Sequence, residues 1–440
     1  MSGVAEVSPK YLADIATNGV PVGYKQTEVG EIPEDWQVTT VGKVVSITTG
    51  NKNTQDKVID GLYPFFVRSQ QVERINTYSF DGEGVLTAGD GVGTGKIFHH
   101  IDGKFDFHQR VYLMYNFGDE LDGYYFYIYF SNNFYDRIMS MTAKSSVDSV
   151  RREMIADMLM VMPPKAEQAA IANALSDVDA LISELEKLIA KKQAIKTATM
   201  QQLLTGRTRL PQFALREDGT PKRTKPSELG EIPEDWEVTG LGDIAAITKL
   251  AGFEYTNHFN SYKDGGEVIV VRGTNITKNI LDLSDVKTIP TSTSKLLPRS
   301  QLSAGDIVFA YVGTVGPVYM IREDNKYHLG PNTAKITCNN KVAPEFLRTY
   351  FTSYLIKQQI DEHLSVGAQP SLSMGKIRSF NILLPTIAME QTAIATILSD
   401  MDEEIQALEQ RLGKTRQIKQ GMMQELLTGK TRLIKGEAHG

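Results

Sequence analysis

Cysteine is almost missing from this chain of 440 residues, which contains only Cys338. A single thiol excludes an internal disulfide framework and a cysteine-rich zinc site, and it is typical of a protein made for a reducing cytoplasm. Long hydrophobic runs are missing as well, since none approaches the roughly 20 apolar residues that cross a bilayer. Residues 1–10 contain no basic segment followed by an apolar core. We therefore expect a cytoplasmic protein with no membrane contact and no signal peptide.

The chain also lacks an excess of basic residues. It contains 47 Lys and Arg against 53 Asp and Glu, which gives a net charge of −6. A free-standing DNA-binding protein usually carries a basic surface that displaces counterions from phosphate. The composition therefore argues against such a protein, unless a partner supplies most of the phosphate contacts.

Sequence motifs of common enzymes are absent. The glycine-rich stretch at residues 91–96 is not a nucleotide-binding P-loop, because Asp90 stands where the first glycine is required and Lys96 is followed by Ile97. Pro163-Pro164 is followed by Lys165, and not by the aromatic residue of the amino-methyltransferase motif. We therefore expect no catalytic residue in this chain.

Metal-binding patterns are equally sparse. His99, His100 and His108 form the one local group of histidines, without nearby cysteine or helical spacing, and we expect no metal site there. The carboxylates of Asp282 and Asp285 are too few to indicate a nuclease site. We expect no cofactor bound by this chain.

The sequence does contain a long internal duplication, which is the first feature to interpret in any chain. Gly30-Glu31-Ile32-Pro33-Glu34-Asp35-Trp36 returns at residues 230–236, and these two copies hold the only two tryptophans. Residues 167–210 align without a gap on residues 390–433, with 24 of 44 positions identical. The stretches between these segments differ almost beyond alignment. This contrast favours a repeated scaffold that carries two different domains over a duplication without functional meaning.

The repeated segments 167–204 and 390–427 have the pattern of long helices. Each follows proline, ends at Gly206 or Gly429, and spans roughly 57 Å at 1.5 Å per residue. Apolar residues recur at heptad spacing, which favours pairing of the two helices over separate packing on two cores. The expected seam consists of Leu175, Val178, Ile182, Leu185 and Ile189, with Leu398, Met401, Ile405, Leu408 and Leu412 at equivalent positions. Because one helix leads into the second variable domain and the other leaves it, the pair is expected to be antiparallel.

The variable stretches, about 51–160 and 251–382, mix short β-type runs with Gly, Asn and Asp turns. Their glycine loops, such as Gly93-Thr94-Gly95, are interpreted as turns more readily than as phosphate-binding loops. The aromatic segments at Tyr129-Phe130 and Tyr350-Phe351 are interpreted as helical core. Few landmarks survive in both stretches, so the two domains are expected to bind different ligands.

Arg68 and Arg272 each end a predicted strand before a polar loop. Arginine can bind guanine bidentately, and Gln71 or Asn275 can do the same for adenine. A structural salt bridge is an equally good interpretation of either arginine. The candidate DNA-binding residues are Arg68, Gln70, Gln71, Arg74, Lys96, Gln109, Arg110, Arg272, Thr274, Asn275, Lys278 and Asn332.

Over nearly its whole length the chain resembles the specificity (S) subunits of type I restriction–modification enzymes. The matching residues are the Gly-Glu-Ile-Pro-Glu-Asp-Trp segments at Gly30 and Gly230, the Glu-Gln pairs at Glu167 and Glu390, and the closing Leu-Leu-Thr-Gly-Arg/Lys-Thr-Arg-Leu segments. The resemblance implies two target-recognition domains that each read one half of a split double-stranded DNA site. It also implies docking of two methyltransferase (M) subunits, which bind S-adenosylmethionine, and association with restriction (R) subunits.

The expected fold class is α+β, with two mixed target-recognition domains joined by two long antiparallel coiled-coil helices in a pseudo-two-fold repeat. The expected segments are an N-terminal extension (1–29), recognition domain 1 (30–162), helix 1 (163–210), a linker (211–229), recognition domain 2 (230–384), helix 2 (385–433) and a tail (434–440). The stretch before Gly30 departs from the repeat. Two alternatives remain, a two-headed protein-interaction adaptor and a self-sufficient DNA methyltransferase, although the latter lacks its catalytic motif.

Overall fold

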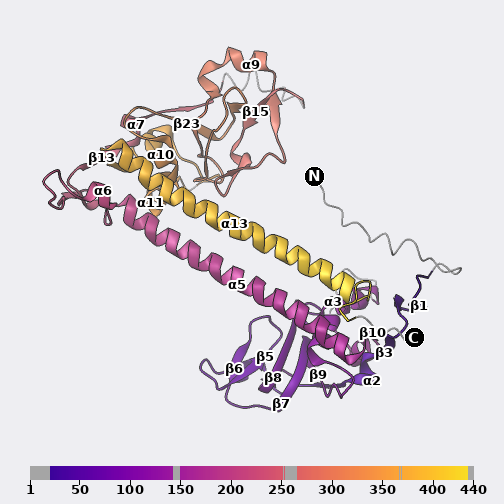
Figure 1. Cartoon of the computed structure of the whole chain (residues 1–440). Helices are drawn as coiled ribbons and strands as arrows, with labels where there is room; N and C mark the ends of the chain where they lie inside the picture. The colour runs from indigo at the N-terminus through magenta and orange to yellow at the C-terminus, as the bar shows by residue number, and fades with distance from the viewer. Residues whose placement is uncertain are drawn as a thin grey trace. The chain divides into compact units, whose positions relative to one another are not determined.

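The structure is a computed structural model that describes residues 20–141, 149–250, 252, 265–365, 367 and 369–434. Residues 1–19 of the expected extension and 435–440 of the expected tail lie outside the described residues. The chain divides into two compact units, unit 1 (Met1–Glu186 with Arg411–Gly440) and unit 2 (Lys187–Gln410). Each unit mixes helices and strands (Figure 1), so the expected α+β class is confirmed. None of the helices in the described part of the chain is long and apolar enough to cross a membrane.

Unit 1 is built around a six-stranded sheet of order β4-β9-β7-β8-β5-β6. Neighbouring strands are antiparallel except β5 and β8, which run parallel where Phe65 and Phe66 face Asp106 and Phe107. The elements are β1 (Tyr24–Thr27), β2 (Gly30–Pro33), β3 (Gln37–Thr40), α2 (Val41–Val44), β4 (Ser46–Thr49), η1 (Thr54–Asp56), β5 (Tyr63–Phe66), β6 (Glu73–Ile75), β7 (Phe80–Ala88), β8 (Phe98–Phe107), β9 (Val111–Tyr115), α3 (Gly123–Ser140), α4 (Arg152–Ala156), β10 (Leu159–Met162) and the start of α5 (Lys165–Leu204).

The aromatic helix α3 forms much of the core of unit 1. Phe126, Phe130 and Phe134 are spaced four residues apart, so they share one face of the helix, and all three are fully buried. Their rings stack in sequence, with centroids 5.5 Å and 4.5 Å apart. The expectation that Tyr129-Phe130 belongs to the core is confirmed.

Unit 2 contains two four-stranded sheets, of order β14-β23-β20-β21 and β18-β15-β22-β19, beside two-stranded pairs such as β13-β24. Its elements are α6 (Pro211–Ala214), β11 (Thr224–Ser227), β12 (Gly230–Pro233), β13 (Trp236–Gly240), α7 (Leu241–Ile244), β14 (Ala245–Lys249), β15 (Val268–Val271), η2 (Gly273–Asn275), β16 (Ile276–Thr277), β17 (Ile280–Leu281), β18 (Lys287–Ile289), α9 (Thr291–Leu296), η3 (Pro298–Ser300), β19 (Gln301–Leu302), β20 (Ile307–Ala310), β21 (Val318–Met320), β22 (Tyr327–Leu329), β23 (Thr333–Cys338), α10 (Pro344–Phe351), α11 (Tyr354–His363), α12 (Met374–Arg378), β24 (Asn381–Pro385) and α13 (Ala388–Leu426).

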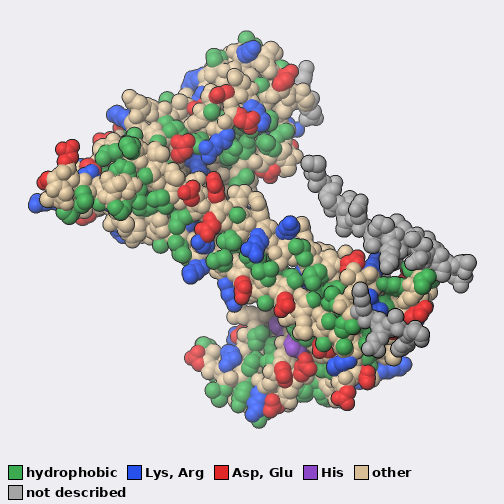
Figure 2. All heavy atoms as spheres, in the orientation of Figure 1, with side chains coloured by type: hydrophobic (Ala, Val, Ile, Leu, Met, Phe, Trp, Pro, Cys, Tyr) green, Lys and Arg blue, Asp and Glu red, His purple; other side chains and the backbone are tan. Residues whose placement is uncertain are grey.

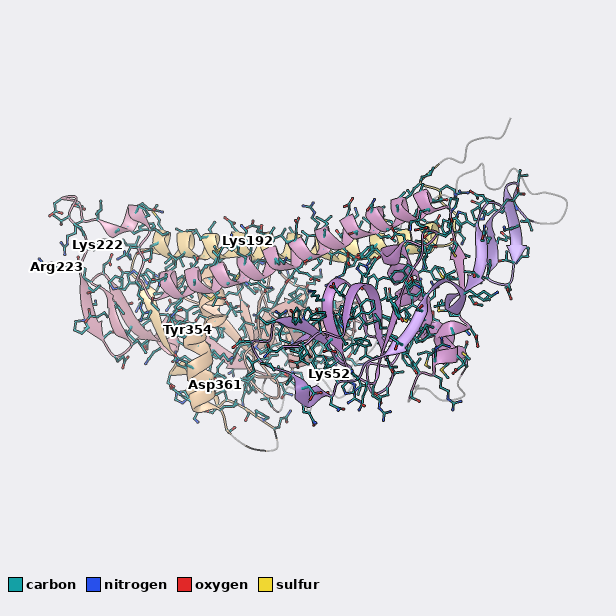
Figure 3. The ribbon with its side chains drawn as sticks, turned by 90° about the horizontal axis from the view of Figure 1, so that it is seen from below. Lys52, Lys192, Lys222, Arg223, Tyr354 and Asp361 are labelled. Carbon is teal, nitrogen blue, oxygen red and sulfur yellow. The ribbon has the colours of Figure 1, made fainter. Side chains whose placement is uncertain are left out.

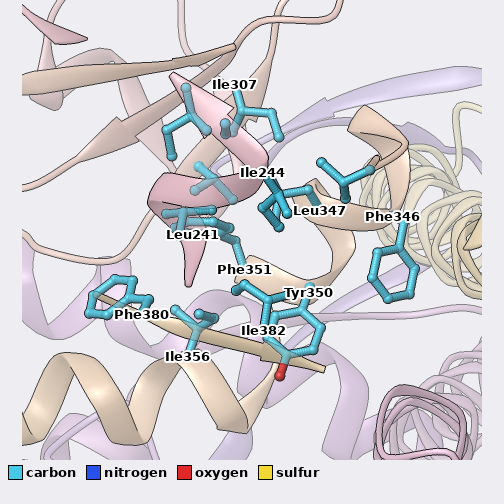
Figure 4. Close-up of a cluster of buried hydrophobic side chains, with 14 of the residues drawn as sticks. Leu241, Ile244, Ile307, Phe346, Leu347, Tyr350, Phe351, Ile356, Phe380 and Ile382 are labelled. Carbon is cyan, nitrogen blue, oxygen red and sulfur yellow. The ribbon is translucent and has the colours of Figure 1, made fainter. Parts of the chain in front are cut away.

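The core of unit 2 gathers apolar side chains from α7, α10, α11, β20 and β24 (Figure 4). Tyr350 and Phe351 are buried in it, as the sequence predicts. The Tyr350 hydroxyl accepts a hydrogen bond of 3.1 Å from the Leu383 backbone N–H, so a buried polar group is satisfied by the strand that leads into α13. Each unit therefore buries its own core, although their sheets differ in strand number and order.

The repeat begins earlier than the sequence analysis expects. β1 pairs with β2 in the register Tyr24↔Pro33, and β11 pairs with β12 in the same register at positions 200 residues later, Thr224↔Pro233. The Thr27 hydroxyl donates to the Gly30 carbonyl, and Ser227 donates to Gly230 in the same way. The expectation that the chain departs from the repeat before Gly30 is therefore wrong from Tyr24 onward. Backbone pairing defines this hairpin, and it tolerates different side chains.

The helices α5 and α13 lie side by side in each unit (Figure 1) and carry opposite charges toward each other. In unit 1, Asp179 pairs with Lys419 and Glu186 with Arg416, both at 2.6 Å. In unit 2, Lys192, labelled in Figure 3, pairs with Glu404 at 2.7 Å. A second pair there joins Lys196 to Asp402. Residue numbers rise on one helix as they fall on the other, so the segments are antiparallel within each unit.

The apolar residues expected to form the seam are buried or half-buried in these helix segments, and Leu175 and Leu398 belong to the cores of units 1 and 2. Leu175, Leu185, Ile189, Leu398 and Ile405 are buried, and Val178, Ile182, Met401, Leu408 and Leu412 are half-buried. Exposed ion pairs contribute at most about 1 kcal/mol each. The ion pairs therefore contribute little to stability, and the prediction that the apolar residues form a coiled-coil seam remains a prediction.

Candidate functional sites

One arginine near the end of α13 joins three repeated segments in unit 1. Arg432 donates to Glu167 from Nε (2.6 Å) and from a terminal nitrogen (2.7 Å), and its guanidinium also holds both oxygens of Asp35, at 3.0 and 2.8 Å. The Trp36 indole N–H donates to the same Glu167 carboxylate at 3.0 Å. The unit 1 arginine cluster (Asp35, Glu167 and Arg432) thus ties the end of one helix to the start of the other.

Unit 2 contains the same arrangement 200 or more residues away. Arg209, after the end of α5, donates to Glu390 at 2.7 and 2.8 Å and to Asp235 at 2.8 and 3.2 Å. The Trp236 indole N–H donates to Glu390 at 3.3 Å. Lys222, labelled in Figure 3, adds a 2.6 Å bond to Asp235. The unit 2 arginine cluster is Asp235, Glu390 and Arg209.

The glutamine that follows each of these glutamates holds the backbone of the adjoining domain. Gln168 accepts from the Asp122 N–H at 2.9 Å and donates to the carbonyls of Glu120 and Pro163. Gln391 accepts from the Ala343 N–H at 2.7 Å and donates to two carbonyls in the same manner. Both amides are fully buried. In each repeated Glu-Gln pair, the glutamate therefore binds the arginine of the cluster and the glutamine binds the backbone of the adjoining domain.

Glycine at the close of each helix permits the tight approach of a tryptophan. Gly206 has a φ of +66°, and a β-carbon there would lie 2.4 Å from Pro233. Gly429 has a φ of +73°, and its β-carbon would lie 2.5 Å from Pro33 and 3.2 Å from Trp36. Glycine adopts this left-handed conformation without strain. The closing segments are therefore packed parts of each unit.

Charge pairing inside these clusters shifts the pKa of their members. The hydrogen bond from Arg432 lowers the pKa of Asp35. Burial opposes ionisation of Asp235, but hydrogen bonds from Arg209 and Lys222 outweigh it and lower the pKa. Burial also works against the charge of Arg432, yet its bonds to Glu167 and Asp35 raise its pKa. Burial raises the pKa of Glu390, although the hydrogen bonds from Arg209 and Trp236 act in the opposite direction. The guanidinium in each cluster cannot lose its proton near neutral pH.

Sequence reasoning did not single out these arginines and carboxylates. The sequence feature that could have identified them is that each is identical in both copies of the repeat, although identity alone does not show which residues are in contact. The contacts show what the identical residues do. The arginine of each closing segment binds the glutamate at the start of the other long helix.

The candidate DNA-binding residues of unit 1 fall into two groups. Arg68 and Arg110 share the Asp90 carboxylate at 2.8 and 3.2 Å, and Gln109 next to them donates to Asn53 at 2.7 Å. Gln70 and Gln71 are exposed on the segment between β5 and β6, and Arg74 donates to the carbonyls of Gly61 and Leu62. Lys96 lies over the Tyr135 ring at 5.1 Å. Only Arg68, Gln109 and Arg110 are brought together.

The candidates of unit 2 are arranged differently. Arg272 turns onto its own loop, where it donates to Asn275 at 3.0 Å and to the Asp285 carboxylate at 3.1 Å. Asn275 is only 4% exposed and donates to the carbonyls of Asp282 and Asp285. Thr274, Lys278 and Asn332 are exposed, and the Asn332 carbonyl accepts from the Tyr311 N–H. Of the two interpretations left open for Arg272, the contacts favour the structural salt bridge.

The remaining local motifs have structural partners. A β-carbon at Gly95 would lie 2.3 Å from Ile138, so this loop is a turn packed against α3. His99 bonds the Ser69 carbonyl at 3.1 Å and His100 bonds Glu83 at 2.8 Å. In the described ranges, no three His, Cys, Asp or Glu side chains lie together as metal ligands would. Figure 2 shows basic and acidic side chains interspersed over the face in view.

Comparison with known proteins extends these observations. The pattern of the family described as the type I restriction modification DNA specificity domain matches residues 33–197 and 233–420. The type I restriction enzyme MjaVIII specificity subunit of Methanocaldococcus jannaschii is 25% identical over 433 residues, covering 93% of this chain and 96% of the relative. The EcoDI specificity subunit of Escherichia coli is 28% identical over 233 residues, half of each chain.

Among solved structures, the S subunit of a type I restriction–modification system from M. genitalium superposes with a TM-score of 0.58 at 15% identity. It covers 89% of this chain and 96% of that one, and the likeness concerns the fold. Two copies of one scaffold, each with its own different domain, define a protein built by internal duplication. The chain belongs to the family of type I restriction modification DNA specificity domains.

Proposed function

We propose that this chain is the DNA-reading specificity subunit of a type I restriction–modification enzyme. Head 1 (residues 30–162) and head 2 (residues 230–384) each read one half of an asymmetric, bipartite site in double-stranded DNA. The observation that carries the proposal is the contrast between identical arginine clusters and unlike heads. The scaffold is the same in both copies, whereas head 1 contains a six-stranded sheet and head 2 two four-stranded sheets. This combination suits one architecture that binds two different targets.

The two long helices complete the proposal. Antiparallel pairing of α5 with α13 would form a two-headed coiled coil with a pseudo-two-fold repeat. Two equivalent faces on such a rod suit two copies of one methyltransferase subunit, on which S-adenosylmethionine would be bound, and restriction subunits would join the same assembly. The partner would also contribute most phosphate contacts, which reconciles DNA recognition with a net charge of −6.

A head-replacement experiment tests this function. β3 pairs with β10 and β13 with β24 at the base of each head, so residues 41–158 can be grafted between Gly240 and Asn381 without changing either arginine cluster. Methylated sites in host DNA are then mapped for the natural complex and for the chain with two copies of head 1. The natural chain is expected to give an asymmetric bipartite motif, and the replaced chain a symmetric one.

The acidic composition is the specific observation that favours the alternative, an adaptor that binds proteins through both heads. An adaptor would leave host methylation unchanged when its gene is deleted, and its complexes would form without DNA. A self-sufficient methyltransferase would methylate DNA with the partner genes absent. Methylation that requires both this chain and its partner subunits supports only the specificity subunit.

A further inference from the structure

Head 1 contains a polar hollow of about 420 Å³ between η1 and the loops that follow β5, β7 and β8. Its lining includes Asn53, Arg68, Asp90, His108, Gln109 and Arg110. Almost every group that faces the hollow can donate or accept a hydrogen bond. A site of this kind suits a ligand that presents a polar edge.

The hollow carries more positive than negative charge. Asp90 binds Arg68 through one carboxylate oxygen at 2.8 Å and Arg110 through the other at 3.2 Å. The Asp90 side chain is 17% exposed, whereas those of Arg68 and Arg110 are 42% and 62% exposed. Each guanidinium has five N–H donors. Both arginines therefore keep donors available to a ligand while the central carboxylate fixes their direction.

Hydrogen bonds of the backbone order the segments that carry Asp90 and Arg110. The Arg110 N–H donates to His108 Nδ1 at 3.0 Å, and the Gln109 N–H donates to the Lys52 carbonyl at 2.9 Å. Burial lowers the pKa of His108, so its ring is neutral at physiological pH and accepts this bond without adding charge. The Arg110 carbonyl accepts from the Gly89 N–H at 2.8 Å, next to Asp90. These contacts hold the backbone at Arg110 and next to Asp90.

We infer that this hollow reads a guanine in the half-site of head 1, with Arg68 or Arg110 donating to its O6 and N7 and Asp90 acting as the positioning residue. The inference rests on the proposed function. A phosphate contact needs only positive charge, which the shared carboxylate partly cancels. A base edge needs donors held in a fixed direction, which the same carboxylate provides.

Among the described residues of head 2, the corresponding arginine is engaged by its own loop. Arg272 is used by Asn275 and Asp285 of its own loop, and its side chain is 18% exposed. The guanine preference is accordingly assigned to one half of the target. This also gives a physical reason for the asymmetry of the target. The corresponding arginines have different roles, since Arg68 would contact DNA whereas Arg272 binds its own loop.

The test uses the full complex with its methyltransferase subunits and maps methylated host sites for Arg68→Lys, Arg110→Lys and Asp90→Asn. Lysine keeps the charge and cannot form the two parallel bonds to guanine. At least one arginine variant and Asp90→Asn are expected to lose discrimination at a single guanine by roughly 10- to 100-fold. The other half-site and the gap should remain unchanged. Arg152→Lys, an exposed arginine on α4 of the same head, is the matched control and should leave the motif intact.

Each other outcome has a distinct meaning. Unchanged motifs in all three variants would overturn the inference, and so would an equal loss at every target sequence, which indicates a phosphate contact. A natural complex without any bipartite motif would instead overturn the proposed function. Urea unfolding of each variant, compared with the natural chain, identifies any loss that comes from misfolding. If Asp90→Asn unfolds, the inference is tested by Arg68→Lys and Arg110→Lys alone. A lysine at either exposed position can still pair with Asp90, so these variants are expected to fold.

Discussion

The guanidinium of Arg432 contacts the carboxylate of Glu167 at 2.6 Å across 265 positions of sequence. Glu167 is 2% exposed, and its carboxylate is bound by this partner and by the Trp36 indole N–H. The equivalent pair in unit 2, Arg209 with Glu390, is also buried. The duplicated residues thus make one type of contact twice, and this contact closes each unit on itself.

Arg432→Ala should destabilise unit 1 strongly. Removing one partner of a buried ion pair leaves an uncompensated charge, which costs about 3–5 kcal/mol. Urea unfolding of the purified chain measures the change, and Arg209→Ala should have a similar effect on unit 2. Arg207→Ala, which removes an exposed arginine two positions away, should change stability by less than about 0.5 kcal/mol. Equal effects of Arg207→Ala and Arg209→Ala would contradict this account.

Asp35→Asn should make stability less dependent on pH. The pKa of Asp35 is lowered by Arg432 in the folded state. A carboxylate of this kind stabilises the protein above its unfolded pKa of about 3.9, and loses that contribution as the pH falls through the folded value. The natural chain should therefore be more stable than the variant at pH 7. The difference should begin to shrink below about pH 4 and vanish only when the pH is below the lowered folded value. Thermal unfolding across this range measures it. Asp60→Asn, on an exposed loop, serves as the control.

Gly429→Ala should destabilise unit 1 through the closing segment. Its φ of +73° strains any side chain, and a β-carbon would lie 2.5 Å from Pro33. We expect a loss of about 1–3 kcal/mol in the free energy of unfolding. Gly413→Ala, in the middle of α13 with nothing within 4 Å of its β-carbon, should instead stabilise the helix by about 1 kcal/mol. The opposite signs of two Gly→Ala changes make this comparison decisive.

Arg272→Ala should lower the stability of unit 2 and leave the DNA motif unchanged. Its hydrogen bonds to Asn275 and Asp285 order a loop, and their loss is expected to cost about 1–3 kcal/mol. Urea unfolding and methylation mapping are both needed. Arg299→Ala, at an exposed position of the same unit, should change neither. Relaxed discrimination in one half-site of a stable variant would restore Arg272 as a base reader.

Lengthening both helices should change the gap between half-sites. The closing segments look like suitable insertion points in the sequence, but Gly206 packs against Pro233 and Arg209 binds Glu390, so an insertion there would disrupt unit 2. Seven residues after Glu186 and seven after Gln410, where the two units divide, keep the heptad seam in phase.

Such an insertion adds about 10 Å of helix, which corresponds to about 3 bp of DNA. Methylation mapping should show a changed gap between unchanged half-sequences. Insertion in α5 alone is the matched control, since it shifts the seam against α13 and should abolish activity. An active enzyme with both insertions and an unchanged gap would show that the helices do not set the spacing.

The sequence alone determined the duplication, the two long helices, the α+β class and the family, because each is visible as identity or periodicity along the chain. The hairpin from Tyr24 was missed, because only Lys25 and Glu28 recur as identical residues, Lys225 and Glu228, in the six positions before Gly30. The partners of Arg68 and Arg272 were decided only by tertiary structure. Both arginines end a strand before a polar loop, yet Arg68 meets Asp90 from 22 positions away while Arg272 meets Asp285 from 13. Local pattern predicts which residues carry charge, and folding alone brings one carboxylate or another within reach.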